Sequence, residues 1–142
     1  MTTLFVDTSA FYALADRSDR HHAAAAAIFR NELGLDQPVT SDHVVVETWY
    51  LLRARLGRPA AMRFWDALAS GIVAILGITA QDFWRGRVIA RQWADQTFSI
   101  VDCTSFALIE RQGITRVFAF DAHFRVFRYG PRRHRALELV PG

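Results

Sequence analysis

Residues 4–10 read LFVDTSA, an apolar run that ends on a carboxylate and two hydroxyls. Residues that favour β-structure lead directly into Asp7, so the pattern predicts a buried strand over residues 3–6 and a helix after it. An aspartate between a strand and a helix is also ordinary turn chemistry. The meaning of Asp7 therefore depends on whether other acids converge on it.

Length and composition predict one domain spanning residues 1–142. Of the 142 residues, 51% are hydrophobic, which is enough for one sizeable core, and no repeat or linker divides the chain. A lone cysteine, Cys103, cannot form an internal disulfide and is typical of a reducing compartment. There is no signal-peptide pattern, and the uncharged stretch 67–81 is shorter than a membrane span. We therefore expect a soluble, cytoplasmic protein without a membrane partner.

All 17 basic residues are arginine, and the formal net charge is +3. Arginine binds phosphate groups in a bidentate manner and stacks on bases, so a polyanionic partner is plausible. The excess charge is mild, and GC-rich coding also favours arginine over lysine. Composition alone leaves both explanations open.

Short β-favouring runs alternate with longer helical ones along the chain. Strands joined by helices imply crossover connections, which predict a three-layer α/β/α fold with a mainly parallel sheet. In such sheets, ligands bind beyond the carboxyl ends of the strands. The expected strands are 3–6, 37–40, 72–76, 116–120 and 136–140, and the expected helices are 9–16, 21–33, 41–57, 59–70, 80–94 and 99–113.

Two strands end on carboxylates. Asp121 follows the strand 116–120 in VFAFDAHF, as Asp7 follows the first strand. Each aspartate alone is explained by a helix cap or a turn. Two carboxylates on one edge of a parallel sheet, however, repel each other unless a positive charge separates them.

Two further acids stand on predicted helices. Glu47 is the only charge in VVVETWYLL (44–52), which predicts a buried helix and a partner for the glutamate, unless Glu47 lies on a narrow solvent stripe with Thr48. Asp102 stands three residues after Ser99, as in a capping box, so it could simply close the helix start. A carboxylate there can also present a second oxygen outward.

Together these four acids form a coherent set for a hard divalent cation. Carboxylates clustered without metal would destabilise one another, and we expect raised pKa values in the metal-free protein. Mg²⁺ prefers oxygen ligands and accepts carboxylates together with substrate phosphate. No histidine and cysteine set suggests zinc, because His43 and His123 lack a spaced cysteine partner.

With these residues assembled, the sequence resembles the PIN-domain nucleases, and most closely the VapC toxins of VapBC toxin–antitoxin pairs. The resemblance covers the whole chain. No single motif is specific, but the order and spacing of four segments are. These segments are LFVDTSAFYALAD, VVVETWYLL, SIVDCTSFAL after ADQTF, and FAFDAHF.

The resemblance implies that Asp7, Glu47, Asp102 and Asp121 bind Mg²⁺ or Mn²⁺ and hydrolyse RNA phosphodiester bonds. It also places Asp95, Thr8 and Ser9 near the site, and Ser99 joins them as the predicted cap of Asp102. The family often carries a hydroxyl two residues before the last aspartate, where this chain has Ala119. The resemblance further implies a VapB-like antitoxin and a homodimer, for which the helices 59–70 and 80–94 could supply an apolar interface.

Clustered arginines are candidates to guide RNA, although any single one could belong to a solvated face. The candidates are Arg53, Arg55, Arg85, Arg87, Arg132 and Arg133. Two other function classes remain open. One is an α/β phosphotransferase or phosphatase that uses Asp7 as nucleophile, although Ser9 stands where the phosphatase pattern has a second aspartate. The other is a catalytically silent module that binds RNA or protein.

Overall fold

The computed structural model describes residues 2–32 and 34–142. At its centre lies a five-stranded sheet in the order β3-β2-β1-β4-β7, and every neighbouring pair of strands is parallel. The strands are β1 (Thr2–Val6), β2 (Asp36–Ser41), β3 (Ala74–Leu76), β4 (Arg116–Phe118) and β7 (Glu138–Val140). The helices are α1 (Thr8–Ala15), α2 (His22–Glu32), α3 (Asp42–Leu56), α4 (Arg58–Leu68), α5 (Ala80–Gln92), α6 (Ile100–Gln112) and α7 (His123–Val126).

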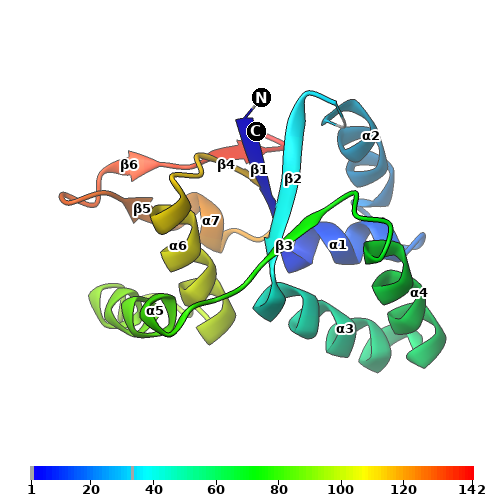
Figure 1. Cartoon of the computed structure of the whole chain (residues 1–142), viewed down its shortest axis with the longest axis horizontal. Coiled ribbons are helices and arrows are strands. Elements are labelled where there is room, and N and C mark those ends of the chain that lie inside the picture. The colour runs from blue at the N-terminus through cyan, green and yellow to red at the C-terminus, as the bar shows by residue number, and fades with distance from the viewer. Residues whose placement is uncertain (1, 33) are drawn as a thin grey trace.

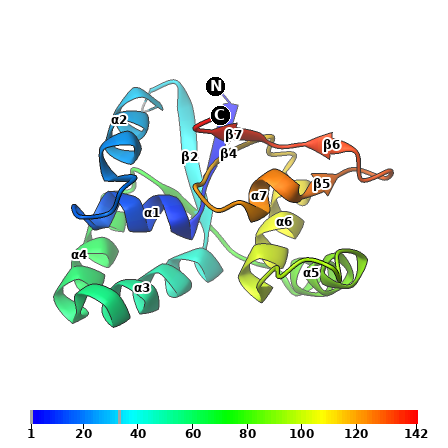
Figure 2. The same cartoon turned by 180° about the vertical axis from the view of Figure 1, so that it is seen from behind.

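Helices cover both faces of the sheet, which confirms the predicted three-layer α/β/α fold. Helices α1 to α4 lie on one side, and α5 and α6 lie on the other (Figures 1 and 2). The central strand β1 contributes Leu4, Phe5 and Val6 to the core, and each is at most 1% exposed. Burial on both faces explains why the strand reads as a continuous apolar run.

Two ends of the predicted sheet differ from the structure. The predicted strand 116–120 stops at Phe118, so two irregular residues separate it from Asp121. The predicted edge strand 136–140 is two elements, β6 (Arg135–Ala136) and β7. Strand β6 pairs with β5 (Arg128–Tyr129) in an antiparallel hairpin that the sequence did not predict, and α7 was also missed. Gly130, at a φ of +89°, and Pro131 turn the chain between them.

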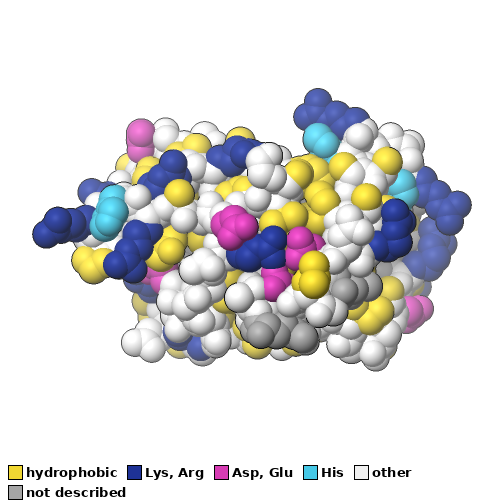
Figure 3. All heavy atoms as spheres, turned by 90° about the horizontal axis from the view of Figure 1, so that it is seen from above, with side chains coloured by type: hydrophobic (Ala, Val, Ile, Leu, Met, Phe, Trp, Pro, Cys, Tyr) yellow, Lys and Arg dark blue, Asp and Glu magenta, His cyan; other side chains and the backbone are white. Residues whose placement is uncertain are grey.

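The amino end of the sheet is held by one arginine. Arg116 of β4 forms ion pairs with Glu32, Asp36 and Glu138, which belong to α2, β2 and β7. Charged side chains of both signs lie side by side near the middle of the face seen in Figure 3. The acids at this end thus have a cationic partner.

The remaining differences are small. The end of the predicted helix 21–33 falls on residue 33, which lies outside the described residues. The predicted strand 72–76 is shorter, beginning at Ala74. Cys103 is buried and carries no disulfide. None of the helices within the described residues is both long and apolar enough to cross a membrane.

Candidate active site

The strand order places a crevice between β1 and β4. Strands β2 and β3 extend the sheet on one side of β1, whereas β4 and β7 extend it on the other. Ligands of parallel sheets bind at such a switch point, beyond the carboxyl ends of the strands. A cavity of about 410 Å³ opens there, and all four predicted acids line it: Asp7, Glu47, Asp102 and Asp121.

Asp7 is the most buried feature of this cavity, with only 4% of the residue exposed. It caps α1, and its Oδ2 accepts hydrogen bonds from the backbone N–H of Ser9 at 3.1 Å and from its hydroxyl at 2.8 Å. Burial raises the pKa of Asp7 to about 7 against the lowering effect of these bonds, and the charge of Asp102 adds to the rise. The ionised form of Asp7 is thus costly without a cation.

Ser9 also joins the two strand ends. Its Oγ accepts hydrogen bonds from the backbone N–H groups of Phe120 at 2.9 Å and Asp121 at 3.2 Å while it donates to Asp7. One hydroxyl therefore fixes Asp7 relative to the chain that carries Asp121. Ser9, predicted to lie near the site, therefore contacts both Asp7 and the backbone of Asp121.

Asp102 lies in the first turn of α6 and forms the predicted capping box with Ser99. Its backbone N–H donates to Ser99 Oγ at 3.0 Å, and its Oδ2 accepts from the Ser99 N–H at 3.0 Å. The same Oδ2 lies 2.7 Å from Nδ1 of His123. The carboxylate thus caps the N-terminus of α6 and also lines the cavity. The structural role and the proposed functional role of Asp102 are therefore compatible.

Glu47 lies half-buried on α3, and Thr8 supports it. Burial raises the pKa of Glu47, a hydrogen bond from Thr8 lowers it, and the charges of Asp102 and Asp121 raise it further. The helix is not buried all round, because Val46 is 55% and Tyr50 61% exposed. Thr48, by contrast, is fully buried, so it forms no solvent stripe with Glu47. The expected rise in pKa holds for Asp7 and Glu47.

His123 is a site residue that the sequence reading passed over. Besides its contact with Asp102, its Nδ1 lies 3.3 Å from Oδ1 of Asp121, and its backbone N–H donates to that oxygen at 2.8 Å. Donor atoms of Asp102, Asp121 and His123 all lie within 4.8 Å of one another. The available signal was the spacing DAH, because an aspartate side chain often accepts a hydrogen bond from the backbone N–H two residues further on, which brings His123 close to Asp121.

Asp95 does not join the acids. It is exposed, its carboxylate accepts a hydrogen bond from the side chain of Gln96, and it is absent from the lining of the cavity. The prediction that Asp95 supports the site is therefore not matched by any contact among the described residues. The loop 93–99 runs along the surface before α6 begins, which explains why nearness in sequence to Asp102 misleads.

The predicted RNA-contacting arginines divide into three groups. Only Arg55 lines the acidic cavity, with its guanidinium 5.1 Å from the ring centre of Tyr12. Arg53 lies over Trp49 at 6.0 Å, and Arg85 is paired with Glu110 at 3.1 Å. The remaining candidates, Arg87, Arg132 and Arg133, are exposed residues outside the lining of this cavity.

Two cavity residues from the α1–α2 loop were also missed. Arg20 and His21 line the cavity, and the imidazole of His21 stacks on the ring of Phe120 at 4.4 Å between centres. The sequence placed His21 in a helix start, where nothing local indicates that it faces the carboxyl end of β4.

The sequence is similar to those of known proteins. The PIN domain family model matches residues 4–128. The 23S rRNA-specific endonuclease VapC20 of Mycobacterium tuberculosis is 35% identical over 126 residues, which cover 85% of this chain and 91% of that protein. Ribonuclease VapC26 of the same species is 28% identical, over 88% of this chain and 92% of that protein.

Solved structures match as well. The crystal structure of M. tuberculosis VapC20, described as a sarcin–ricin loop cleaving toxin, superposes with a TM-score of 0.78 at 32% identity, covering 84% of this chain and 90% of that one. VapBC2 from Rickettsia felis, bound to a promoter DNA fragment, gives a TM-score of 0.71 at 12% identity, covering 97% and 98% of the two chains, and so shows the fold alone. The chain therefore belongs to the PIN-domain family and, within it, to the VapC toxins, which are nucleases.

Proposed function

We propose that this protein is a Mg²⁺- or Mn²⁺-dependent endoribonuclease that acts as the toxin of a toxin–antitoxin pair. The observation that carries the proposal is the convergence of four carboxylates on one cavity at the switch point of the sheet. The relatives named as ribonucleases support the reaction class.

The donor set suits a hard divalent cation. All four acids offer oxygen atoms, which Mg²⁺ and Mn²⁺ prefer, and the raised pKa of Asp7 indicates that its charge lacks a compensating partner. Asp7 and Asp102 would be the most direct ligands, with Glu47 and Asp121 completing the set. The ring nitrogen of His123 that faces the acids is hydrogen-bonded to Asp102, so we assign His123 to orient that carboxylate.

The ion and the side chains around it would then have separate roles in hydrolysis. When bound, the ion lowers the pKa of a water molecule beside it and offsets the extra negative charge of the transition state. Ser9 holds Asp7, and Ser99 with His123 holds Asp102. These bonds occupy the two most buried acids, so Glu47 or Asp121 accepts the proton of the attacking water.

We propose RNA as the substrate and 23S rRNA as the first RNA to test, because the VapC20 relative is named for that activity. Arg20 and Arg55 stand at the cavity and would offset phosphate charge. A second basic surface is the segment 122–137, which carries five arginines and no acid. Arg132 and Arg133 in this hairpin would contact the RNA backbone away from the scissile bond.

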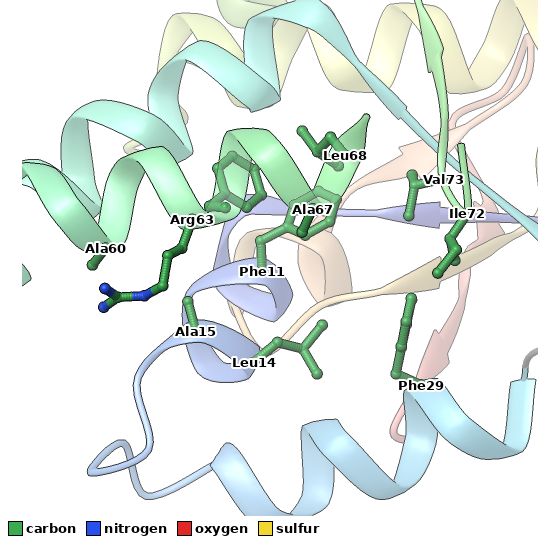
Figure 4. Close-up of a pocket in the computed structure, with 11 residues that line it drawn as sticks. Phe11, Leu14, Ala15, Phe29, Ala60, Arg63, Ala67, Leu68, Ile72 and Val73 are labelled. Atoms are coloured by element: carbon green, nitrogen blue, oxygen red, sulfur yellow. The ribbon is translucent and has the colours of Figure 1, made fainter. Parts of the chain in front are cut away.

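A VapB-like antitoxin is the proposed partner. Helices α1, α2 and α4 enclose a second cavity of about 300 Å³ with an apolar lining that includes Phe11, Phe29 and Phe64, and Arg63 crosses one end (Figure 4). This cavity would accept apolar side chains of the antitoxin. Replacing Ala67, which lines it, with Trp should weaken co-purification of the VapB-type protein encoded beside the gene, while RNA cleavage by the free toxin persists.

The test of the proposed function is cleavage of ribosomal RNA in intact ribosomes by the purified protein with Mg²⁺, mapped by primer extension. We expect discrete cuts that disappear in Asp7→Asn and persist in Asp66→Asn, which changes an exposed aspartate of α4. Equal cleavage by the wild type and Asp7→Asn would contradict the proposal.

A further inference from the structure

The wall of the acidic cavity carries an aromatic pair that the proposed chemistry does not use. The rings of His21 and Phe120 are stacked, with centres 4.4 Å apart and an angle of 13° between their planes. Both residues are half-buried, and both line the cavity with the four acids. Aromatic rings exposed beside a phosphate-cleaving centre are surfaces on which nucleobases stack.

The pair is held at a fixed place relative to the acids. The backbone N–H of Phe120 donates to Ser9 Oγ at 2.9 Å, and that hydroxyl donates to Asp7. On the other side, the N–H of His21 donates to Asp19 Oδ1 at 2.8 Å, and its carbonyl accepts from Ala25 in α2. Two independent anchors thus set the distance from the rings to the carboxylates.

The polar atoms around the pair also suit a nucleotide. Arg20 donates from Nε to Nε2 of His21 at 3.1 Å, which places a guanidinium at the edge of the imidazole ring. Arg20 and Arg55 are exposed at the same cavity, where a guanidinium can pair with the phosphate of the stacked nucleotide.

We propose that His21 and Phe120 form a nucleobase-binding site, on which one unpaired base of the RNA extends the aromatic stack. Base stacking as such does not require catalysis. The position of that base, next to the scissile phosphate, rests on the proposed ribonuclease function. The site would select RNA in which a base is already unstacked, as in a loop or bulge, over a regular duplex.

The simpler explanation is that the stack only fastens the α1–α2 loop to the end of β4. Phe120 does have a second aromatic neighbour, Phe118, at 5.9 Å. A structural role and a base-binding role can be distinguished by experiment. Only base binding makes the response of His21 and Phe120 to a ligand depend on whether that ligand carries a base.

The direct test is an NMR titration of the His21 ring protons with the four ribonucleoside 5′-monophosphates, with ribose 5-phosphate as the control ligand. This measurement needs no cleavage. We expect upfield ring-current shifts that are larger for the purine than for the pyrimidine nucleotides, and no comparable shift with ribose 5-phosphate. Equal shifts with ribose 5-phosphate, or no shift with any nucleotide, would overturn the proposal.

Kinetics then place the site in the reaction. In RNA that the wild type cleaves, His21→Ala should lower kcat/KM about 10- to 100-fold, whereas His21→Phe, which keeps the stack, should retain most of it. The control Trp84→Ala removes an aromatic residue that is 61% exposed and lies outside the cavity lining, and should leave kcat/KM unchanged.

An abasic substitution beside the cleaved bond separates the two roles. With the abasic RNA, the wild type and His21→Ala should converge, because the base that the ring binds is missing. If His21→Ala lowers cleavage of intact and abasic RNA by the same factor, the pair is structural and the proposal fails, although the ribonuclease function stands. If no RNA is cleaved while the NMR shifts appear, the base site stands and the ribonuclease function fails.

Discussion

At the scale of single residues, the behaviour of the site follows from the burial of Asp7. The carboxylate is 4% exposed and accepts two hydrogen bonds from Ser9, which is less than its charge needs in a desolvated place. A bound cation would supply the missing positive charge. Without a bound cation, the same burial of Asp7 lowers the stability of the folded protein.

This effect of Asp7 predicts that the free energy of unfolding of the metal-free protein depends on pH. The pKa of Asp7 is about 7 in the folded state and 3.8 in its unperturbed state, so the folded state binds more protons between these values and the free energy of unfolding falls as pH rises. Between pH 5 and pH 8, the ionisation of Asp7 should lower the free energy of unfolding by roughly 2 to 3 kcal/mol. Glu47, whose pKa is also raised, acts in the same direction.

Urea unfolding in EDTA at pH 5 and pH 8 measures this effect. Asp7→Asn should lose less stability over this range than the wild type, and it should be the more stable protein at pH 8. The variant Asp66→Asn serves as the control, because that residue is exposed. Identical losses in the wild type and Asp7→Asn would show that Asp7 does not carry a raised pKa.

A second residue prediction concerns His123. Its contact with Asp102 at 2.7 Å orients a proposed metal ligand, so His123→Ala should raise the Mg²⁺ concentration needed for half-maximal cleavage about 10- to 100-fold. His123→Gln, which keeps a donor, should recover part of the loss. The matched control is His134→Ala, an exposed histidine of the hairpin. A purely structural role would lower stability but leave the Mg²⁺ requirement unchanged.

At the scale of elements, the close packing of α5 on α6 depends on Gly86. A Cβ added there would lie 3.2 Å from the backbone C and O of Cys103 and from the N of Thr104. Gly86 is therefore the point where the backbones of the two helices meet. Because α6 carries Asp102 at its first turn, this packing also positions the site.

Gly86→Ala should consequently destabilise the protein, although alanine is the better helix former by about 1 kcal/mol. We expect a loss of about 1 to 3 kcal/mol in the free energy of unfolding, since the contacting atoms are backbone and cannot move aside. Chemical denaturation would measure it. A variant more stable than the wild type would show that the helices separate at little cost.

Elements also show what the sequence could and could not predict. The strand that ends on Asp7 and the Ser99–Asp102 capping box were predictable, because each is written in adjacent residues. His21, His123 and the β5–β6 hairpin were not, because each acquires its role from partners distant in sequence, such as Phe120 for His21. Asp95 shows the reverse error, in which nearness in sequence to Asp102 suggested a contact that the fold does not make.

At the scale of the whole molecule, exposed aromatic residues gather on one surface of α3 and α4. On α3 and α4, Val46, Tyr50 and Trp65 are 55%, 61% and 56% exposed and, with Val45 and Trp49, line one shallow apolar cavity. We propose this surface for the expected homodimer, since contiguous exposed apolar patches are typical of interfaces. Of the helix 59–70, which was predicted to supply part of the interface, Trp65 lines this surface.

Trp65→Glu should therefore convert the dimer to a monomer in sedimentation-velocity experiments, because the carboxylate would be buried in the interface. The control is Leu35→Glu, which changes a residue that is 66% exposed and does not line this cavity. A monomeric wild type, or a dimer that tolerates Trp65→Glu, would contradict this assignment.

The two ends of the sheet also differ in charge balance. At the amino end, acids are neutralised by Arg116, whereas at the carboxyl end the four predicted acids share one cavity with Asp19, Arg20 and Arg55. We propose that a divalent cation completes this balance and that RNA cleavage depends on it.

The most direct measurement is the rate of ribosomal RNA cleavage against Mg²⁺ concentration for the wild type and Asp7→Asn. We predict saturable activation of the wild type, abolition by EDTA, recovery with Mn²⁺, and a loss of at least about 100-fold in Asp7→Asn at every Mg²⁺ concentration. Cleavage that persists in EDTA, or that Asp7→Asn leaves intact, would contradict the account.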